Sequence, residues 1–193
     1  ITELKIFPDL QDLELKQLDS IEYLEVCHHP SLKSFEFNSS FWYSKIEELR
    51  VQDCPELEKL DLSIGKMGED PEFSNLSNLT HFHFYAGAGF QCLILENCPS
   101  LIDLVVGGDS LTRISGLEDL HRLESLEITS CSESGFFSLS LKGCKALERL
   151  DLDYRFVKQL NLSGCKQLHN FYPPKDMTKL NLSGCETLEE LDL

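Results

Sequence analysis

The stretch Ile46-Glu-Glu-Leu49-Arg-Val51-Gln-Asp-Cys54-Pro-Glu-Leu57 carries the pattern that decides the fold. Two apolar residues flank one polar residue, and a cysteine follows three positions after the second apolar residue. We call this cysteine position the slot. The same spacing recurs along the chain, and the slot is occupied in turn by His29, Cys54, Cys98, Cys131, Cys144, Cys165 and Cys185.

The residue numbers of successive slots differ by 25, 44, 33, 13, 21 and then 20. The step from Cys54 to Cys98 corresponds to two repeats, and the two steps from Cys98 to Cys144 together correspond to two more. A repeat of about 20–25 residues is typical of a solenoid, in which each coil packs on its neighbours. We therefore expect residues 1–193 to form one repeat domain of about eight repeats.

Apolar and polar residues alternate at two places in most repeats, as in Leu93-Ile-Leu95 and then Leu104-Val-Val106. Such alternation predicts half-buried strands. Most repeats have no room for a helix of about 10 residues as well. The predicted fold is an α/β-type, mostly β solenoid. It is a right-handed superhelix whose slot-bearing strands form a concave parallel sheet, with mainly extended or 3₁₀ segments on the convex side.

Several segments depart from this plain pattern. Residues 72–79 and 114–123 place a leucine at every third position, which predicts a helical or 3₁₀ turn on the convex side. Residues 63–71, 85–89 and 132–135 contain glycine and predict loops that bulge from the solenoid. Both ends of the chain already match the repeat and neither resembles a polar cap, so we expect a piece of a longer protein.

The chain has 17 basic and 33 acidic residues, which gives a net charge of -16 and a pI near 4.7. This charge repels phosphate backbones and anionic lipids. The sequence also contains no apolar stretch of about 18 residues that could span a membrane. We expect no nucleic-acid partner and no membrane insertion. A basic partner and an acidic surface that only keeps the protein soluble are both compatible with the charge.

Six of the eight cysteines occupy slots, where a thiol can satisfy backbone groups of the turn and behaves as a small apolar side chain. Cys27 and Cys92 fall at positions expected to face outward. This distribution favours reduced thiols and a cytosolic or nuclear compartment. Five glycosylation sequons favour the opposite, although two of them arise from the repeat itself. They begin at Asn38, Asn75, Asn78, Asn161 and Asn181.

Reactive constellations are scarce. Cys27, His28 and His29 are metal-ligand residue types, but adjacent strand residues point to opposite faces and cannot converge on one ion. His81 and His83 share a face, but no third ligand lies nearby in the sequence. The sequence has no Cys-x-x-Cys motif and no complete phosphate loop. We expect no metal, no cofactor and no enzyme activity.

The Leu-x-x-Leu-x-Val-x-x-Cys-Pro-x-Leu stretch ending at Leu57 resembles the leucine-rich repeat, and the resemblance covers nearly the whole chain. This variant, together with residues 114–131, is similar to the repeat domain of plant nucleotide-binding leucine-rich-repeat immune receptors. In that family the repeats restrain a nucleotide-binding switch and recognise pathogen effector proteins. Residues 160–168 and 180–188 are also similar to short repeats of bacterial surface proteins, which suggests adhesion or scaffolding at the bacterial surface or after secretion.

In this architecture the outward residues of the slot-bearing strands form the recognition surface. Among them, Ile94 is an apolar residue that could anchor a partner. Arg50, Lys158 and Lys179 are expected in corresponding columns. The aromatic run at 41–43 is a second candidate contact. The expected partner-binding row consists of Tyr23, Glu25, Glu48, Arg50, Gln91, Ile94, Glu127, Lys158, Asn161, Lys179 and Asn181.

Overall fold

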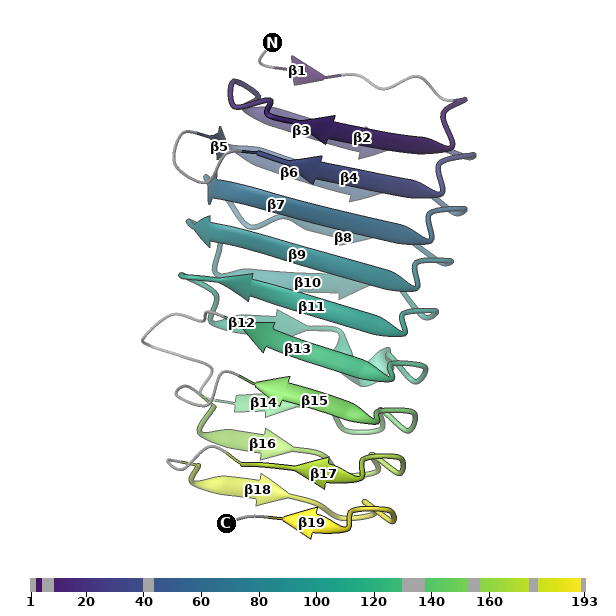
Figure 1. The fold of residues 1–193 in the computed structure, drawn as a ribbon, viewed down its shortest axis with the longest axis vertical. Coiled ribbons are helices and arrows are strands. Elements are labelled where there is room, and N and C mark those ends of the chain that lie inside the picture. Colours follow the sequence, from purple (N-terminus) through teal and green to yellow (C-terminus); the bar gives the residue numbers. More distant parts are fainter. Residues whose placement is uncertain are drawn as a thin grey trace.

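The computed structural model describes residues 3–4, 9–39, 44–129, 138–152, 157–173 and 177–191. The chain winds into a stack of flat coils, and each coil contributes strands to two layers that lie face to face (Figure 1). Strands of the two layers run in opposite directions, because each coil passes along one layer and returns along the other (Figure 1). Every strand pairing within the described ranges is parallel, since neighbouring strands in a layer come from successive coils.

The layer that carries the slots lies behind in Figure 1 and contains sheets A and C. Sheet A is formed, in order, by β1 (Glu3–Leu4), β3 (Tyr23–Cys27), β6 (Glu48–Gln52), β8 (Glu72–Ser74), β10 (Cys92–Glu96) and β12 (Arg113–Ser115). Sheet C is formed by β14 (Ser138–Ser140), β16 (Gln159–Asn161) and β18 (Lys179–Asn181). The 3₁₀ turn η1 (Leu117–Asp119) follows β12.

The front layer contains sheets B and D (Figure 1). Sheet B is formed by β2 (Asp12–Lys16), β4 (Ser34–Asn38), β7 (Lys59–Met67), β9 (His81–Ala88), β11 (Asp103–Gly108), β13 (Ser125–Thr129) and β15 (Arg149–Leu152), with β5 (Lys45–Ile46) also pairing with β7. Sheet D is formed by β17 (Asn170–Phe171) and β19 (Glu190–Leu191).

The register of the strands reproduces the sequence period. In sheet B, one row of paired residues runs through Asp12, Ser34, Lys59, His81, Asp103, Ser125 and Arg149. In sheet C the corresponding row runs through Ser138, Gln159 and Lys179. Successive members of each row are one repeat apart in the sequence. Each alternating segment therefore places its leucines beside those of the coils before and after it.

The core lies between the two layers and follows directly from the alternation. Leu24 and Val26 of β3 and Leu60 and Leu62 of β7 are at most 1% exposed. Phenylalanines fill the middle of the stack. Phe84 packs edge-on against Phe73 and Phe90, with ring centroids 5.4 and 5.0 Å apart. The contact with Phe73 joins β9 to β8, so it ties the two layers together.

One residue in most coils has a left-handed backbone, and it directly precedes the slot. Among the residues that the structure describes, seven of this kind have φ between 54° and 86°, and they are His28, Asp53, Asn75, Asn97, Gly143, Gly164 and Gly184. Glycine adopts this conformation without strain, and Asn and Asp adopt it more readily than other side chains. The reversal of φ bends the chain out of the strand and directs the slot side chain into the core.

A tight turn follows the slot. The carbonyl of Cys54 accepts the backbone N–H of Leu57 at 3.1 Å, and the carbonyl of Cys98 accepts that of Leu101 at 3.4 Å. Proline is favoured at the second position of such a turn because its φ is already set. This preference explains why Pro55 follows Cys54 in the sequence.

The mostly β, parallel-sheet solenoid predicted from the sequence is confirmed, but its second side is more regular than expected. The extended convex segments pair with one another into sheet B. Residues 63–67 and 85–88, expected as loops, continue strands β7 and β9. Glycine allows the neighbouring strand β11 to pair along this extension. Gly108 pairs with Ala86, and a Cβ on Gly108 would lie 2.4 Å from the Phe90 ring.

The two predicted helical turns have different outcomes. Residues 114–123 contain the 3₁₀ turn η1, as expected. Residues 72–79 instead begin with strand β8, because Phe73 pairs with Leu95 and is 2% exposed. Burial of an aromatic side chain in the sheet outweighs the spacing of Leu76 and Leu79, which lie in the turn beyond the strand.

Replacing Phe84 by Ala should lower the free energy of unfolding by about 3–5 kcal/mol, because it opens a cavity between the layers. Val105→Ala is the matched control on the neighbouring strand β11. Its side chain faces outward, so its cost should stay below about 1 kcal/mol. Urea unfolding of both variants measures the difference. Equal losses would contradict a core located between the sheets.

Candidate binding surface

The slot side chains lie in a buried column beneath the turns. Cys54, Cys144 and Cys165 are fully buried, and each thiol donates a hydrogen bond to a backbone carbonyl of the preceding coil. For Cys165 the acceptor is the carbonyl of Leu141, with a sulfur–oxygen distance of 3.3 Å. Cys185 makes the same bond to the carbonyl of Leu162 at 3.2 Å but is only partly buried.

Burial controls the acidity of these thiols. Loss of hydration raises the pKa of Cys98 to about 11 and that of Cys165 to about 12. The pKa of Cys144 rises to about 12, first because of burial and then because of the Glu118 charge. His29 occupies its slot at 5% exposure, and its Nδ1 has no hydrogen-bond partner among the described residues. Burial, followed by the neighbouring His28, lowers the pKa of His29.

The slot between Cys54 and Cys98 is filled by Leu76, which is fully buried. The long interval between these two cysteines thus spans two coils. Cys131 was expected to fill a slot in the same column, but the strand before it, β13, pairs with β11 and β15 in sheet B. Its Leu-x-Ile triplet therefore belongs to the other layer, and Cys131 itself lies outside the described residues. The aromatic run at 41–43 also lies outside them.

The outer face of sheet A holds five of the eleven residues in the expected partner-binding row. Paired residues of successive strands form columns across this face. One column contains Tyr23 and Glu48, and the next outward-facing column contains Glu25, Arg50, Glu72 and Ile94. Tyr23 is 46% exposed and Ile94 is 42% exposed, so both apolar surfaces are open to solvent. A hollow of about 260 Å³ lies on this face and is lined by Tyr23, Leu24, Glu25, Glu48 and Arg50.

Carboxylates surround the single guanidinium of this hollow. Arg50 forms an ion pair with Glu48, and its Nε donates to Glu72 Oε2 at 3.2 Å. Gln52 Nε2 donates to the same oxygen at 2.9 Å. These contacts hold Arg50 along the sheet, and they leave the exposed ring of Tyr23 at the rim. The hollow combines an apolar wall with a predominantly acidic border.

Other members of the row lie elsewhere. Glu127 does not belong to this surface, contrary to expectation, because β13 places it on the outer face of sheet B. Lys158 is one residue out of register, since Gln159 pairs with Lys179. The column that corresponds to Arg50 therefore holds Asn161 and Asn181. Gln91 lies just before β10, where its backbone N–H donates to Asp70 Oδ1 at 2.5 Å.

Asn161 and Asn181 have local structural partners. Their side-chain oxygens accept the backbone N–H groups of Ser163 and Ser183 at 3.1 and 3.0 Å. These bonds stabilise the turn before each glycine. On sheet C, Asn161 and Asn181 of the expected row are thus engaged in turn formation.

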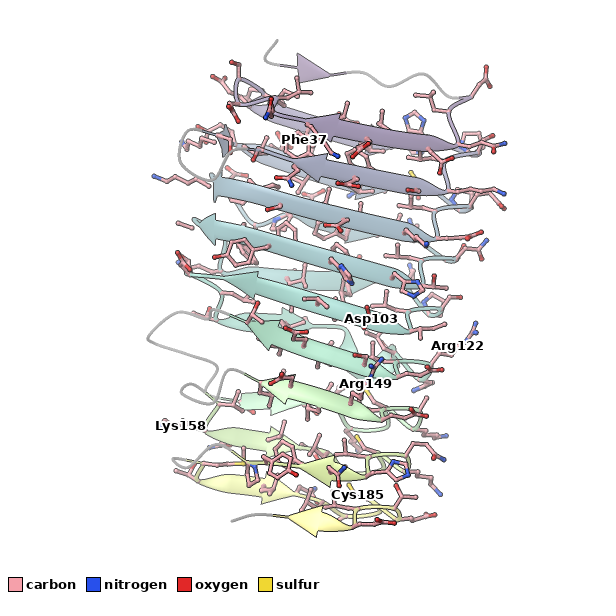
Figure 2. All side chains as sticks on the ribbon, viewed as in Figure 1. Phe37, Asp103, Arg122, Arg149, Lys158 and Cys185 are labelled. Atoms are coloured by element: carbon pink, nitrogen blue, oxygen red, sulfur yellow. The ribbon has the colours of Figure 1, made fainter. Side chains whose placement is uncertain are left out.

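The outer face of sheet B carries several carboxylates and the histidine pair. His83 Nε2 lies 3.0 Å from Asp103 Oδ2, and Nδ1 lies 3.7 Å from Asp61 Oδ2. Figure 2 labels Asp103 together with Arg149, which stands on the same face. In the part of the chain that the structure describes, no group of three or more His, Cys, Asp or Glu side chains is arranged to hold a metal ion.

Sequence reasoning missed a ladder of polar side chains at the left-handed positions. Asn97 Nδ2 donates to Asn75 Oδ1 at 2.8 Å, and Asn75 Nδ2 donates to Asp53 Oδ1 at 2.7 Å. His28 Nδ1 lies 3.2 Å from Asp53 Oδ2. The available signal was an Asn or Asp directly before the slot in three successive repeats. Because Asn and Asp favour the left-handed region, their recurrence once per repeat predicts that their side chains lie next to one another in successive coils.

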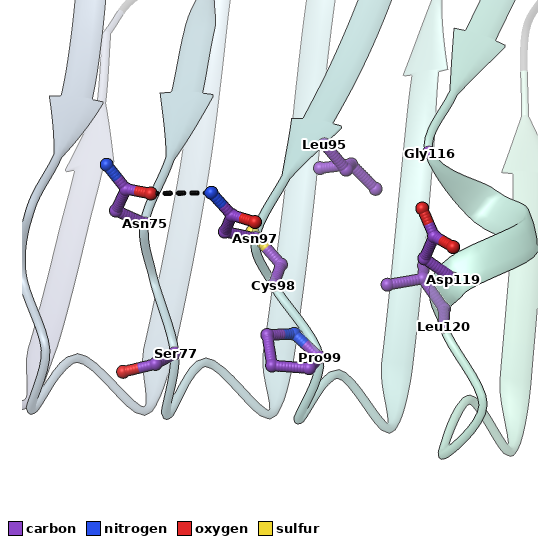
Figure 3. Close-up of a pocket in the computed structure, with 9 residues that line it drawn as sticks. All are labelled: Asn75, Ser77, Leu95, Asn97, Cys98, Pro99, Gly116, Asp119 and Leu120. Carbon is purple, nitrogen blue, oxygen red and sulfur yellow. Dashed lines mark hydrogen bonds between the residues drawn. The ribbon is translucent and has the colours of Figure 1, made fainter.

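The ladder ends beside a hollow of about 370 Å³ (Figure 3). It ends there because the next coil turns earlier than its neighbour. Ser115 pairs with Ile94, so the following residue, Gly116, is in register with Leu95, two positions before Asn97. Gly116 has φ 90° and turns the chain at this point. A Cβ on Gly116 would lie 2.2 Å from the carbonyl oxygen of Leu95. The hollow is lined by Asn75, Ser77, Leu95, Asn97, Cys98, Pro99, Gly116, Asp119 and Leu120.

No protein-family profile matches the sequence. Among solved structures, the chain is similar to a leucine-rich repeat protein from Bacteroides ovatus. The identity is 15%, the alignment covers 99% of this chain and 78% of the other, and the TM-score is 0.38. The molecule's own geometry defines its class: a mostly β solenoid of leucine-rich coils with two parallel-sheet layers. Among the described residues, no helix is long and apolar enough to cross a membrane.

The raised thiol pKa values predict a loss of stability at alkaline pH. Folding holds Cys144 and Cys165 as neutral thiols, so their contribution is complete below pH 9.0 and is lost as pH rises from about 9 towards about 12. The double variant Cys144→Ser/Cys165→Ser keeps a hydrogen-bond donor but does not ionise in this range. Its urea midpoint should therefore fall less between about pH 8 and about pH 10.5 than that of the parent. If the urea midpoints of the parent and the variant fell equally over this pH range, ionisation of the two buried thiols would not be the cause of the alkaline loss.

Proposed function

We propose that this chain is a protein-recognition module that binds its partner with the outer face of sheet A. The observation that carries the proposal is the hollow beside Tyr23 and Arg50, on a rigid sheet face where Ile94 is also exposed. Tyrosine and arginine are among the residue types most often found at the centres of protein interfaces. A sheet whose residues are fixed by pairing on both sides loses little entropy on binding.

The charge of the chain indicates the chemistry of the partner. A net charge of -16, with Glu25, Glu48 and Glu72 on the binding face, favours a partner with a basic patch. Arg50 is the basic residue among these carboxylates, and its guanidinium can also pair with one carboxylate of the partner. Recognition of another protein, without catalysis or a cofactor, is the function that this surface supports best.

Within this class, we propose first a role in a plant intracellular immune receptor. The repeats would recognise a pathogen effector or restrain the receptor's own upstream domains. The resemblance of the Cys-Pro-x-Leu repeats to that family supports this role. So do Cys54, Cys144 and Cys165, which are buried free cysteines, each within hydrogen-bond distance of a backbone carbonyl. Reduced cysteines are typical of the cytosol or nucleus.

The second candidate is a bacterial surface or secreted protein that serves adhesion or scaffolding. The observation that favours it is the regularity of sheet C. There, two consecutive coils repeat the Leu-Asn-Leu-Ser-Gly-Cys sequence at 160–165 and 180–185 in register. Short repeats of this kind are similar to those of bacterial surface proteins.

The test of the module uses two triple variants with matched chemistry. Tyr23→Ala/Arg50→Ala/Ile94→Ala removes a ring, a guanidinium and an aliphatic side chain from sheet A. His81→Ala/Arg149→Ala/Val105→Ala removes the same three types of group from the outer face of sheet B. Partners cross-linked to the parent chain in an extract of its source are identified, purified and titrated against all three proteins by calorimetry.

The first variant should weaken direct binding at least about tenfold, because hot-spot residues contribute at least about 1.4 kcal/mol in total. The second should change affinity less than about twofold. If only the sheet B variant lost binding, the proposed face would be wrong. If no purified protein bound saturably to the parent chain, the recognition function itself would be contradicted.

The two origins are separated by the state of the cysteines. The chain is purified from its source without reductant, unfolded, alkylated with iodoacetamide and weighed by mass spectrometry. Alkylation of all eight thiols, with no other added mass, would support the intracellular receptor. Disulfides or glycans on the sequons would support the secreted or surface-exposed protein.

A further inference from the structure

We propose that the hollow at the end of the asparagine ladder binds the guanidinium group of an arginine side chain on a partner protein. The inference rests on the proposed recognition function and deepens it by naming one contact group of the partner. The site lies at the turn edge of sheet A, where β8, β10 and β12 leave the sheet. It is separate from the hollow beside Tyr23.

The ladder fixes the polarity of the site. The carboxylate of Asp53 can only accept hydrogen bonds, so Asn75 must present its Nδ2 group to it and turn its oxygen the other way. Asn97 must then donate its Nδ2 group to Asn75 Oδ1. This chain of bonds determines the orientation of both amides. The end of the ladder at Asn97 is therefore an acceptor, and Oδ1 has no hydrogen-bond partner among the described residues.

A second acceptor borders the same hollow. Asp119, in the turn η1, is exposed and lies across the hollow from Asn97 (Figure 3). The neighbouring Glu118 is already bonded to Ser140, whose Oγ lies 2.6 Å from Oε1. A carboxylate and an amide oxygen on two sides of one hollow require a ligand that donates in two directions and carries positive charge.

The floor of the hollow is apolar. Leu95, Cys98 and Leu120 are 5%, 3% and 2% exposed, and Pro99 lies at the rim (Figure 3). Arginine matches this composition. Its planar guanidinium has five donors in a fork, and its aliphatic stem packs well on apolar surface. Lysine offers one compact charge, and a neutral amide offers no charge to Asp119. The volume of about 370 Å³ is at the small end of ligand pockets, which suits one long side chain.

The geometry of Gly116 keeps the hollow open. A side chain there would collide with the carbonyl oxygen of Leu95. Because the coil turns at this residue, two positions early, it has no left-handed residue in register with Asn97. In the preceding coils, each ladder amide donates to the side-chain oxygen of the coil before it. A guanidinium from a partner would donate to Asn97 Oδ1 in the same way.

The test titrates the ¹⁵N-labelled chain with N-acetyl-L-arginine amide, which resembles an arginine within a polypeptide, and follows the amide signals by NMR. The side-chain amide of Asn97 and the backbone amide of Asp119 should shift, with a Kd of about 1 mM. The neutral isostere N-acetyl-L-citrulline amide and N-acetyl-L-lysine amide should each bind at least about fivefold more weakly.

Two variants locate the site. Asp119→Asn removes the charge, and Asn97→Gly removes the amide while keeping a left-handed backbone. Each should weaken binding about fivefold or more. Asp151→Asn, on the exposed face of β15, makes the same charge change elsewhere and should leave binding unchanged. Unperturbed Asn97 and Asp119 signals, or equal binding by Asp119→Asn, would overturn the inference.

Two further outcomes are distinguishable. Tighter binding of free L-arginine than of the capped residue would overturn a partner's side chain as the occupant and indicate a small-molecule site. The recognition function is tested independently by the sheet A and sheet B variants. If partner binding through Tyr23, Arg50 and Ile94 persisted while the arginine probe failed to bind, only the guanidinium site would be wrong.

Discussion

A reversal of backbone φ directly before each slot is the constraint on which the rest of the structure depends. A strand that continued with negative φ would carry the chain past the edge of the sheet. The left-handed residues at Asp53, Asn75 and Asn97 instead turn it inward, so the slot side chain enters the core and a tight turn starts the return strand. Both layers, their parallel pairing and the buried sulfur column follow from this bend.

The two halves of the stack meet this constraint by different chemistry. Up to Asn97 the left-handed residues directly before the slots are polar, and the side chains of Asp53, Asn75 and Asn97 bond from coil to coil. In sheet C they are glycines, with nothing within 4 Å of a Cβ built on Gly143. The change occurs around Gly116, where the coil turns early and opens the hollow. The candidate guanidinium site thus lies where the left-handed residues change from polar side chains to glycine.

Much of this arrangement could be predicted from the sequence. The spacing at Leu49, Val51 and Cys54 defines a strand, a bend and a buried thiol, since alternation and burial are local properties. Glu127 was misplaced because its triplet, followed by Cys131, has the same local spacing. Only the register with Asp151 and Val105 assigns it to sheet B. The ladder pocket could not be predicted, because it depends on a turn that begins two positions early at Gly116.

The bend before the slot is tested most directly at Gly164, which has φ 83° and only two backbone atoms of Gly143, at 3.7 Å, near its missing Cβ. The free energy of unfolding of Gly164→Asn and Gly164→Val should be compared with that of the parent. Asparagine tolerates the left-handed region, so its cost should stay below about 1 kcal/mol, whereas β-branched valine should cost roughly 2 kcal/mol or more. If valine were tolerated as well as asparagine, the left-handed bend would not be the element that holds each coil.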